Sequence, residues 1–273
     1  SRFRKSFQTF KKMNFQTSFN QSKIICFNEL KQSFKNWKII VALVIYLVIM
    51  FASLNLVDDL QETLGNVDFP GKRDNIDVYD NIRENFGSLS IIVPFSLALI
   101  ILPFIVLFMN FDSISNERNS NRFRYLLMKT DLHNLLLGKF FTSIIILSIS
   151  TIFFFLITDV HLHFYLGESF NFSSLFYPWL FLIFYGASLS AFFILTSSFF
   201  KSSFGALAGG LLGMFALMIF SSIPVVGYFG LFSYLKFAVY SSFGKALLSV
   251  VMFFVLSILY LFLAYLKIRR SDL

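Results

Sequence analysis

Charged residues are scarce in this sequence: they make up 14% of its 273 positions, while hydrophobic residues make up 56%. A soluble domain of this length normally carries about 25% charge. Phenylalanine alone occurs 40 times. Lipid does not solvate charge, so a chain that faces lipid over most of its surface explains both numbers. The composition predicts a membrane protein rather than a soluble domain.

The sequence also lacks the usual motifs for ATP hydrolysis and for common catalytic sites, and it lacks the cysteines for a disulfide or a cysteine metal cluster. Cys26 is the single cysteine, which excludes an intrachain disulfide or a cysteine metal cluster. The string closest to a phosphate loop, residues 65–73 (GNVDFPGKR), has one residue too many between its glycines and Arg where Ser or Thr is needed. No His-Glu-x-x-His or G-x-S-x-G string is present. We therefore expect no catalytic residue, metal or cofactor in this chain.

Six hydrophobic runs are long enough to cross a bilayer, which takes about 20 apolar residues. Pro94 and Pro103 fall inside the second run, where we expect a kink or a locally unwound stretch. The runs hold essentially no charge, whereas ion-coupled carriers usually bury charge in their spans. We predict an all-α polytopic membrane protein, with a basic arm over 1–38 and a six-span domain over 39–273. The spans cover about residues 39–57, 88–110, 140–158, 175–200, 204–222 and 246–266.

The basic arm contains nine Lys and Arg but one acid, Glu29. From Lys23 onward its apolar residues recur at helical spacing, opposite Lys31 and Lys35. Such a helix lies in the membrane interface with its lysines toward the headgroups. We expect an interfacial helix over residues 23–36.

The fifth span carries Gly205, Gly209 and Gly213 on one helix face, which permits close helix approach. Packing within one subunit, a subunit interface and a pathway lining all explain this ladder. Residues 223–245 are too broken for a straight span and too apolar for a solvated loop. They are typical of an outer re-entrant or interfacial hairpin.

The distribution of Lys and Arg predicts that both termini are cytosolic. With the N-terminus inside, 18 of the 23 Lys and Arg fall in inner segments. The acidic loop 58–86 is then outside. So is a second loop, which holds Asp159, His161, His163, Glu168 and the glycosylation sequon at Asn171. An ordinary polar loop explains these side chains, and metal binding and glycosylation are left open.

Residues 111–139 form the one long polar, basic segment between apolar runs. Phe123, Leu126 and Leu127 are spaced as one apolar helix face beside charged neighbours such as Arg122 and Arg124. A short amphipathic helix of this kind suits a socket on a soluble partner. A cytosolic loop that binds lipid headgroups is the alternative.

The same segment resembles the cytosolic signature of exporter-type (type-two) ABC transporter permeases. Glu117-Arg118 matches the family's acidic-basic pair, Leu126-Leu127 its leucine pair, and Leu137-Gly138-Lys139 its close. The tail 267–273 and Glu29-Leu30 are similar to the family too. Departures are Asn121-Arg122 at the Gly-Thr place, Thr130 at the proline place and His133 at the arginine place.

The resemblance implies a permease subunit in a prokaryotic plasma membrane, which moves a hydrophobic or amphipathic substrate. Two such chains, identical or paralogous, would pair with two soluble ATPase subunits that bind ATP and magnesium. Glu117 to Leu127, Arg118 and Arg122 included, would meet the ATPase, with the interfacial helix transmitting its motion. The second and fifth spans would line the pathway. Alternatives are a mechanical transmitter to an extracytoplasmic partner at 58–86, or a stand-alone carrier or membrane enzyme.

Overall fold

The computed structural model describes residues 15–33, 36–65, 89–120, 122–166, 172–223, 231–235 and 243–272. Regular structure within these ranges is entirely helical, which confirms the predicted fold class. In chain order the elements are α2 (Phe15–Ser33), α3 (Trp37–Gly65), α5 (Leu89–Asn110), α6 (Ser115–Asn119), α7 (Arg122–Lys129), α8 (Leu132–Leu166), α9 (Phe172–Phe199), α10 (Ser203–Ser221), η3 (Leu231–Tyr234) and α12 (Phe243–Asp272).

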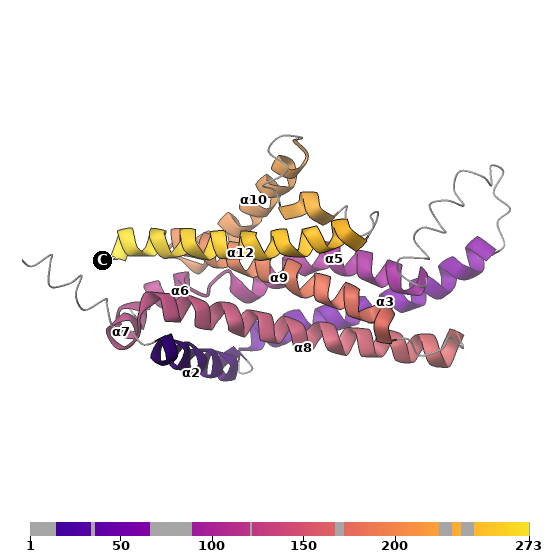
Figure 1. The fold of residues 1–273 in the computed structure, drawn as a ribbon, viewed down its shortest axis with the longest axis horizontal. Helices are drawn as coiled ribbons and strands as arrows, with labels where there is room; N and C mark the ends of the chain where they lie inside the picture. Colours follow the sequence, from indigo (N-terminus) through magenta and orange to yellow (C-terminus); the bar gives the residue numbers. More distant parts are fainter. Residues whose placement is uncertain are drawn as a thin grey trace, which may run out of the picture.

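The longest helices lie side by side and form an elongated bundle (Figure 1). Five stretches in the described part are long and apolar enough to cross a membrane. A sixth is present if Ser22–Ser33 and Trp37–Ser53, which meet at a bend of 74°, form one broken span. Outward-facing side chains on these helices are largely apolar, as lipid contact requires. The prediction of a polytopic membrane protein is therefore confirmed, with five or six candidate spans.

Several helices are longer than the apolar runs that predicted them. Helix α8 starts at Leu132 and ends at Leu166, well outside the predicted 140–158, and α3 continues to Gly65, into the predicted polar loop. Hydropathy finds residues that tolerate lipid, but backbone hydrogen bonding continues beyond the hydrocarbon core. Helix α5 passes through Pro94 and Pro103 without interruption, so the unwound stretch that we considered is not there.

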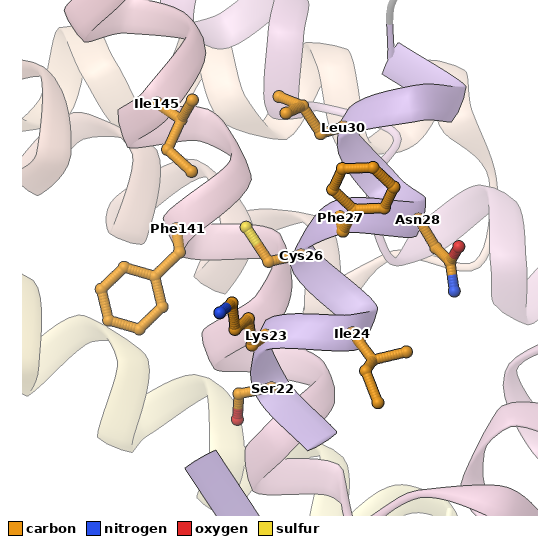
Figure 2. A pocket seen from close by; sticks show the side chains of 9 residues that line it. All are labelled: Ser22, Lys23, Ile24, Cys26, Phe27, Asn28, Leu30, Phe141 and Ile145. Atoms are coloured by element: carbon orange, nitrogen blue, oxygen red, sulfur yellow. The ribbon is translucent and has the colours of Figure 1, made fainter. Parts of the chain in front are cut away.

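Helix α2 lies along the first half of α8. At one end the hydroxyl of Ser22 donates to Oδ1 of Asn134 (3.1 Å), and further along that of Thr142 donates to the carbonyl of Cys26 (3.2 Å). Gly138 allows this approach, because a Cβ at that position would lie 2.5 Å from Cγ2 of Ile25. Part of the α2–α8 contact stays open as a groove of about 790 Å³ (Figure 2).

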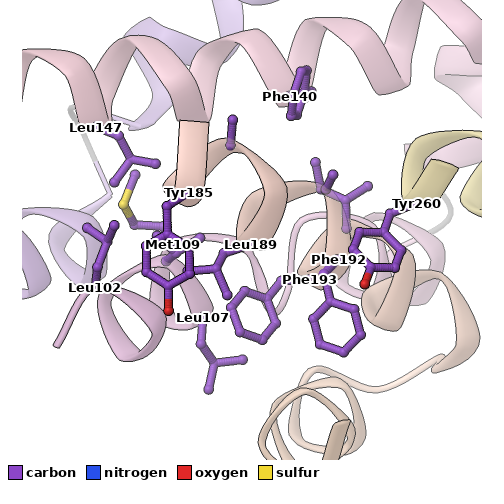
Figure 3. Close-up of a cluster of buried hydrophobic side chains, with 14 of the residues drawn as sticks. Leu102, Leu107, Met109, Phe140, Leu147, Tyr185, Leu189, Phe192, Phe193 and Tyr260 are labelled. Atoms are coloured by element: carbon purple, nitrogen blue, oxygen red, sulfur yellow. The ribbon is translucent and has the colours of Figure 1, made fainter. Parts of the chain in front are cut away.

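The centre of the bundle is α9, which packs against α5, α8, α10 and α12. Its aromatic rings pack edge to face against those of α12. The ring centroids are 5.3 Å apart for Phe181 and Phe253, and 5.5 Å apart for Phe192 and Tyr260. Tyr185, Phe192 and Phe193 gather with side chains of α5, α8 and α12 in the buried cluster (Figure 3). Such aromatic pairs add about 0.5–1.5 kcal/mol each beyond burial.

Helix α10 leans away from the bundle (Figure 1), and its glycine ladder faces the end of α9. A Cβ on Gly209 would overlap the ring of Phe200, and one on Gly213 would lie 2.9 Å from Cζ of Phe192. At least two of the ladder glycines therefore pack against aromatic rings of the same chain. Use of the ladder as a subunit interface or a pathway lining stays a prediction.

The connections between α3 and α5 and between α10 and α12 are described only in part. In the predicted hairpin 223–245, residues 224–230 and 236–242 lie outside the described residues, while Leu231 and Tyr234 are buried against the bundle. The hydroxyl of Ser233 donates to the carbonyl of Ser221 (3.0 Å), and that of Ser249 to the carbonyl of Tyr234 (3.4 Å). This short element therefore links the ends of α10 and α12. Residues 66–86 of the acidic loop are outside the described part as well.

The Gly209–Phe200 contact predicts the outcome of a single added methyl group. Gly209→Ala should lower the melting temperature of the purified chain, although alanine favours an isolated helix by about 1 kcal/mol. Phe200→Ala in the same chain should recover much of that loss, because it removes the ring that the methyl group meets. Gly186→Ala is the control and should cost less, since its Cβ would meet aliphatic side chains rather than a ring: Cδ1 of Leu147 at 3.0 Å and Cδ2 of Leu102 at 3.4 Å. A Gly209→Ala chain that melts higher than the parent would contradict this packing.

Candidate functional site

The polar segment 111–139 consists of two short helices and the start of a long one. Helix α5 ends at Asn110, α6 covers Ser115–Asn119, α7 covers Arg122–Lys129, and α8 begins at Leu132. The first two turns of α8 therefore contain the Leu-Gly-Lys close. In Figure 1, α6, α7 and the end of α12 lie at the same end of the bundle. The segment thus caps one end of the bundle and is continuous with α5 and α8.

Helix α6 is tied to the last turn of α9 by two kinds of hydrogen bond. The backbone N–H groups of Ile114 and Ser115 both donate to Oγ of Ser197, at 3.2 and 3.1 Å. The first N–H groups of a helix have no partner within it, so Ser197 acts as its cap from another helix. In return, Arg118 donates from its guanidinium to the carbonyl of Ser198 (2.7 Å), where α9 leaves its own carbonyls unpaired.

A buried lysine joins three elements that are distant in sequence. Lys139, on α8, has 6% of its side chain exposed. Its ammonium lies 2.7 Å from Oε1 of Glu117 on α6 and 3.2 Å from Oε1 of Glu29 on α2. An isolated buried ammonium is strongly unfavourable, so the two carboxylates make its burial possible. We call Glu29, Glu117 and Lys139 the lysine triad.

A second ion pair lies nearby and is more exposed. The ammonium of Lys38, at the start of α3, is 3.0 Å from Oδ2 of Asp112, just after α5. The Lys38 side chain is 41% exposed. Asn110, two residues before Asp112, is buried. Its side chain accepts a hydrogen bond from the hydroxyl of Ser143 (2.6 Å) and donates one to the carbonyl of Val106 (3.0 Å). These contacts hold the ends of α3, α5 and α8 in register.

Helix α7 turns its predicted apolar face toward its own chain. Phe123 is 2% exposed and belongs to the hydrophobic core, and Leu126 and Leu127 are partly buried against that core. Among the side chains of α7 that the structure describes, Met128 is apolar and open, at 83% exposure. The three residues expected to fill a partner's socket therefore anchor α7, and Met128 offers the accessible apolar surface.

The other predicted residues are spread over the structure. Glu29 lies in the triad, Lys31 is exposed on α2, and Lys35 is outside the described residues. Arg122 begins α7. His161 and His163 are on α8 rather than in an extended loop, and Glu168 and Asn171 are not described. In the described part of the chain no three His, Cys, Asp or Glu side chains form a group that could hold a metal.

Sequence reasoning missed the partnership of Lys139 with Glu29 and Glu117, and the capping role of Ser197. One signal was available: Lys139 is a cation at the entry to an apolar run, and a cation buried there needs acidic partners. The partners themselves are 110 and 22 residues away. Helical periodicity relates only near neighbours, so the pairing had no signature in the sequence.

A comparison with protein families agrees with this arrangement. A family profile described as "ABC-2 family transporter protein" matches residues 23–241, which include most of α2 and every described element through η3. The chain belongs to the ABC-2 family of transporter membrane proteins. Curated proteins give no match to the chain.

Membership of the ABC-2 family explains the missing phosphate loop, because permeases of this family lack an ATP-binding domain. ABC permeases generally work with ATPase subunits. The ABC-2 match begins at Lys23 and so takes in Glu29, Glu117 and Lys139 together. The lysine triad thus lies entirely within the residues that the family profile matches.

The lysine triad predicts a non-additive loss of stability. Glu29→Gln or Glu117→Gln alone leaves one carboxylate on Lys139 and should cost about 1 kcal/mol. The double variant leaves the buried ammonium uncompensated and should cost about 3–5 kcal/mol, more than the two single losses together. Thermal unfolding of the purified chain in detergent measures all three.

Asp112→Asn is the matched control, because it removes the carboxylate of the exposed Lys38 pair. It should cost less than about 1 kcal/mol. Additive losses at Glu29 and Glu117, or an equal loss at Asp112, would show that Lys139 does not depend on the two acids.

Proposed function

We propose that this chain is the permease subunit of an ATP-driven ABC exporter, and that α6 and α7 receive the motion of a separate ATPase. The supporting observation is the way in which the segment is attached. Glu117 is bound to α8 through Lys139, and Arg118 is bound to α9 through the Ser198 carbonyl. A displacement of α6 therefore acts on the third and fourth spans at once.

The interfacial helix enters the same linkage. Glu29 brings α2 to Lys139, and Gly138 lets α2 approach α8 closely. Helix α2 is joined to α3 by a bend of 74°. Movement of α6 relative to α2 would change both ion pairs of the Lys139 ammonium, one with each helix. The lysine triad is therefore where a motion of α6 and a motion of α2 would be coupled.

Two such chains would form the transport unit, with the pathway between their second and fifth spans. Helix α10 supports this arrangement because it has a large apolar face without cover from its own bundle. Phe204, Leu212, Phe215 and Ile219 are all more than half exposed on it. We expect a hydrophobic or amphipathic substrate, and a prokaryotic plasma membrane as the location. Transmission of force to an extracytoplasmic partner at loop 58–86 is the second candidate.

A substitution at Met128 tests whether α7 contacts an ATPase. Met128→Glu replaces the exposed apolar side chain by a charge, so recovery of the ATPase in a pull-down from native membranes should fall about tenfold or more, as loss of about 1.4 kcal/mol gives. Gln32→Glu, also exposed and equal in charge change, lies on α2 and should leave recovery unchanged. Undiminished recovery with Met128→Glu, or cargo movement by the chain alone along an ion gradient, would refute the proposal.

Glu117→Gln should separate ATPase binding from transmission. Glu117 lies in the ion pair between α6 and α8 rather than on the exposed face of α7, so the Glu117→Gln variant should still recover the ATPase. Spin labels at Phe164→Cys and Phe220→Cys, in a Cys26→Ser chain, report the outer ends of α8 and α10. Vanadate trapping of the complex should change their distance in the parent, and clearly less in the Glu117→Gln chain. An equal change in both chains would remove Glu117 from the transmission route.

A further inference from the structure

The groove between α2 and α8 is a feature that the transport proposal does not use. It has a volume of about 790 Å³, within the range of small-molecule sites. Its walls are mainly apolar. Ile24, Phe27 and Leu30 come from α2, and Phe141 and Ile145 come from α8 (Figure 2). Among its lining residues there is one charged side chain, the exposed Lys23, and no acid.

The groove has its one charged side chain, Lys23, at one end, while further along α2 the neutral Asn28 is the polar side chain among apolar ones. Ser22 and Lys23 lie near the start of α8, where Ser22 bonds to Asn134. Leu30 and Ile145 belong to later turns of their helices, and Ile145 is well inside the candidate span Leu132–His161. A ligand that fills the groove would therefore have its polar group at Lys23 and its apolar part directed into the membrane.

The apolar end continues onto the outer surface of α8. Phe141, Ile145, Ile149, Ile152 and Phe153 are all exposed, and their spacing places them on one face of the helix. This face carries the features of a lipid-facing surface. An acyl chain that lies between Phe27 and Ile145 has an uninterrupted apolar path along α8 into the bilayer.

From these observations we infer that the groove binds an anionic phospholipid of the leaflet next to α6 and α7. The headgroup phosphate lies at Lys23, and one acyl chain lies between α2 and α8. A net negative headgroup is favoured over a zwitterionic one, because Lys23 has no acid beside it in the groove. Glu29, six residues further along α2, is already bound to Lys139.

Cys26 provides a reporter inside the groove, since it lines the groove and is the only cysteine of the chain. The test is the rate of alkylation of Cys26 by the neutral reagent N-ethylmaleimide, with the full chain in nanodiscs. Discs of phosphatidylcholine are compared with discs that also contain phosphatidylglycerol. We expect roughly fivefold slower alkylation with phosphatidylglycerol, the ratio that corresponds to about 1 kcal/mol for one lysine near an anionic surface.

Two lysine variants separate a bound lipid from a general surface effect. Lys23→Gln should abolish the protection by phosphatidylglycerol. Lys31→Gln, on the same helix but outside the groove lining, should retain it. Lipid extracted from the purified parent and Lys31→Gln chains should be enriched in phosphatidylglycerol relative to the Lys23→Gln chain. Protection that persists undiminished in Lys23→Gln would overturn the proposal.

Two other possible occupants of the groove, residues 1–14 and inorganic phosphate, would give different alkylation rates. If residues 1–14 fill the groove, Cys26 is protected equally in both kinds of disc, and their deletion accelerates alkylation in both; this outcome overturns the proposal. Inorganic phosphate in phosphatidylcholine discs should leave the rate unchanged, because it does not fill the apolar end. Protection by inorganic phosphate alone would also overturn it.

Discussion

The buried ammonium of Lys139 is the interaction on which the α6–α7 end of the bundle depends. A charge that is 6% exposed at the entry to an apolar helix is stable only while carboxylates remain beside it. Those carboxylates come from α6 and α2, so one atom of α8 bonds to both elements at once. Gly138, one residue earlier, makes the arrangement possible because it lets α2 come within reach.

Helix α9 connects these contacts at one end of the bundle to the other helices. Ser197 and Ser198, in its last turn, hold the start of α6 and the guanidinium of Arg118. The rest of α9 packs on α5, α8, α10 and α12 through buried aromatic rings. A contact at its end therefore reaches most of the spans through side chains that have little room to rearrange. The peripheral α10 is joined to this centre mainly by glycines against phenylalanine rings.

Much of this architecture was accessible from the sequence. The apolar runs predicted helical spans because lipid contact imposes one long, uncharged pattern on each helix. The Glu117–Leu127 region and the close at Lys139 indicated the ABC permease family, which the match over residues 23–241 supports. The ends of α3 and α8 were predicted poorly, because polar residues continue a helix beyond the lipid without any apolar signal.

By itself, the sequence determined the membrane environment through its composition, and its short motifs indicated the family through their resemblance to the permease signature. Permeases of that kind generally work with ATPase subunits. Neither conclusion requires knowing which residues are in contact. The tertiary structure alone decided that Phe123 faces inward while Met128 faces outward, and that Glu29 and Glu117 share Lys139. An amphipathic helix has the same pattern whether its apolar face meets its own core or a partner. A charge pair between residues 110 positions apart exists only once the helices have packed.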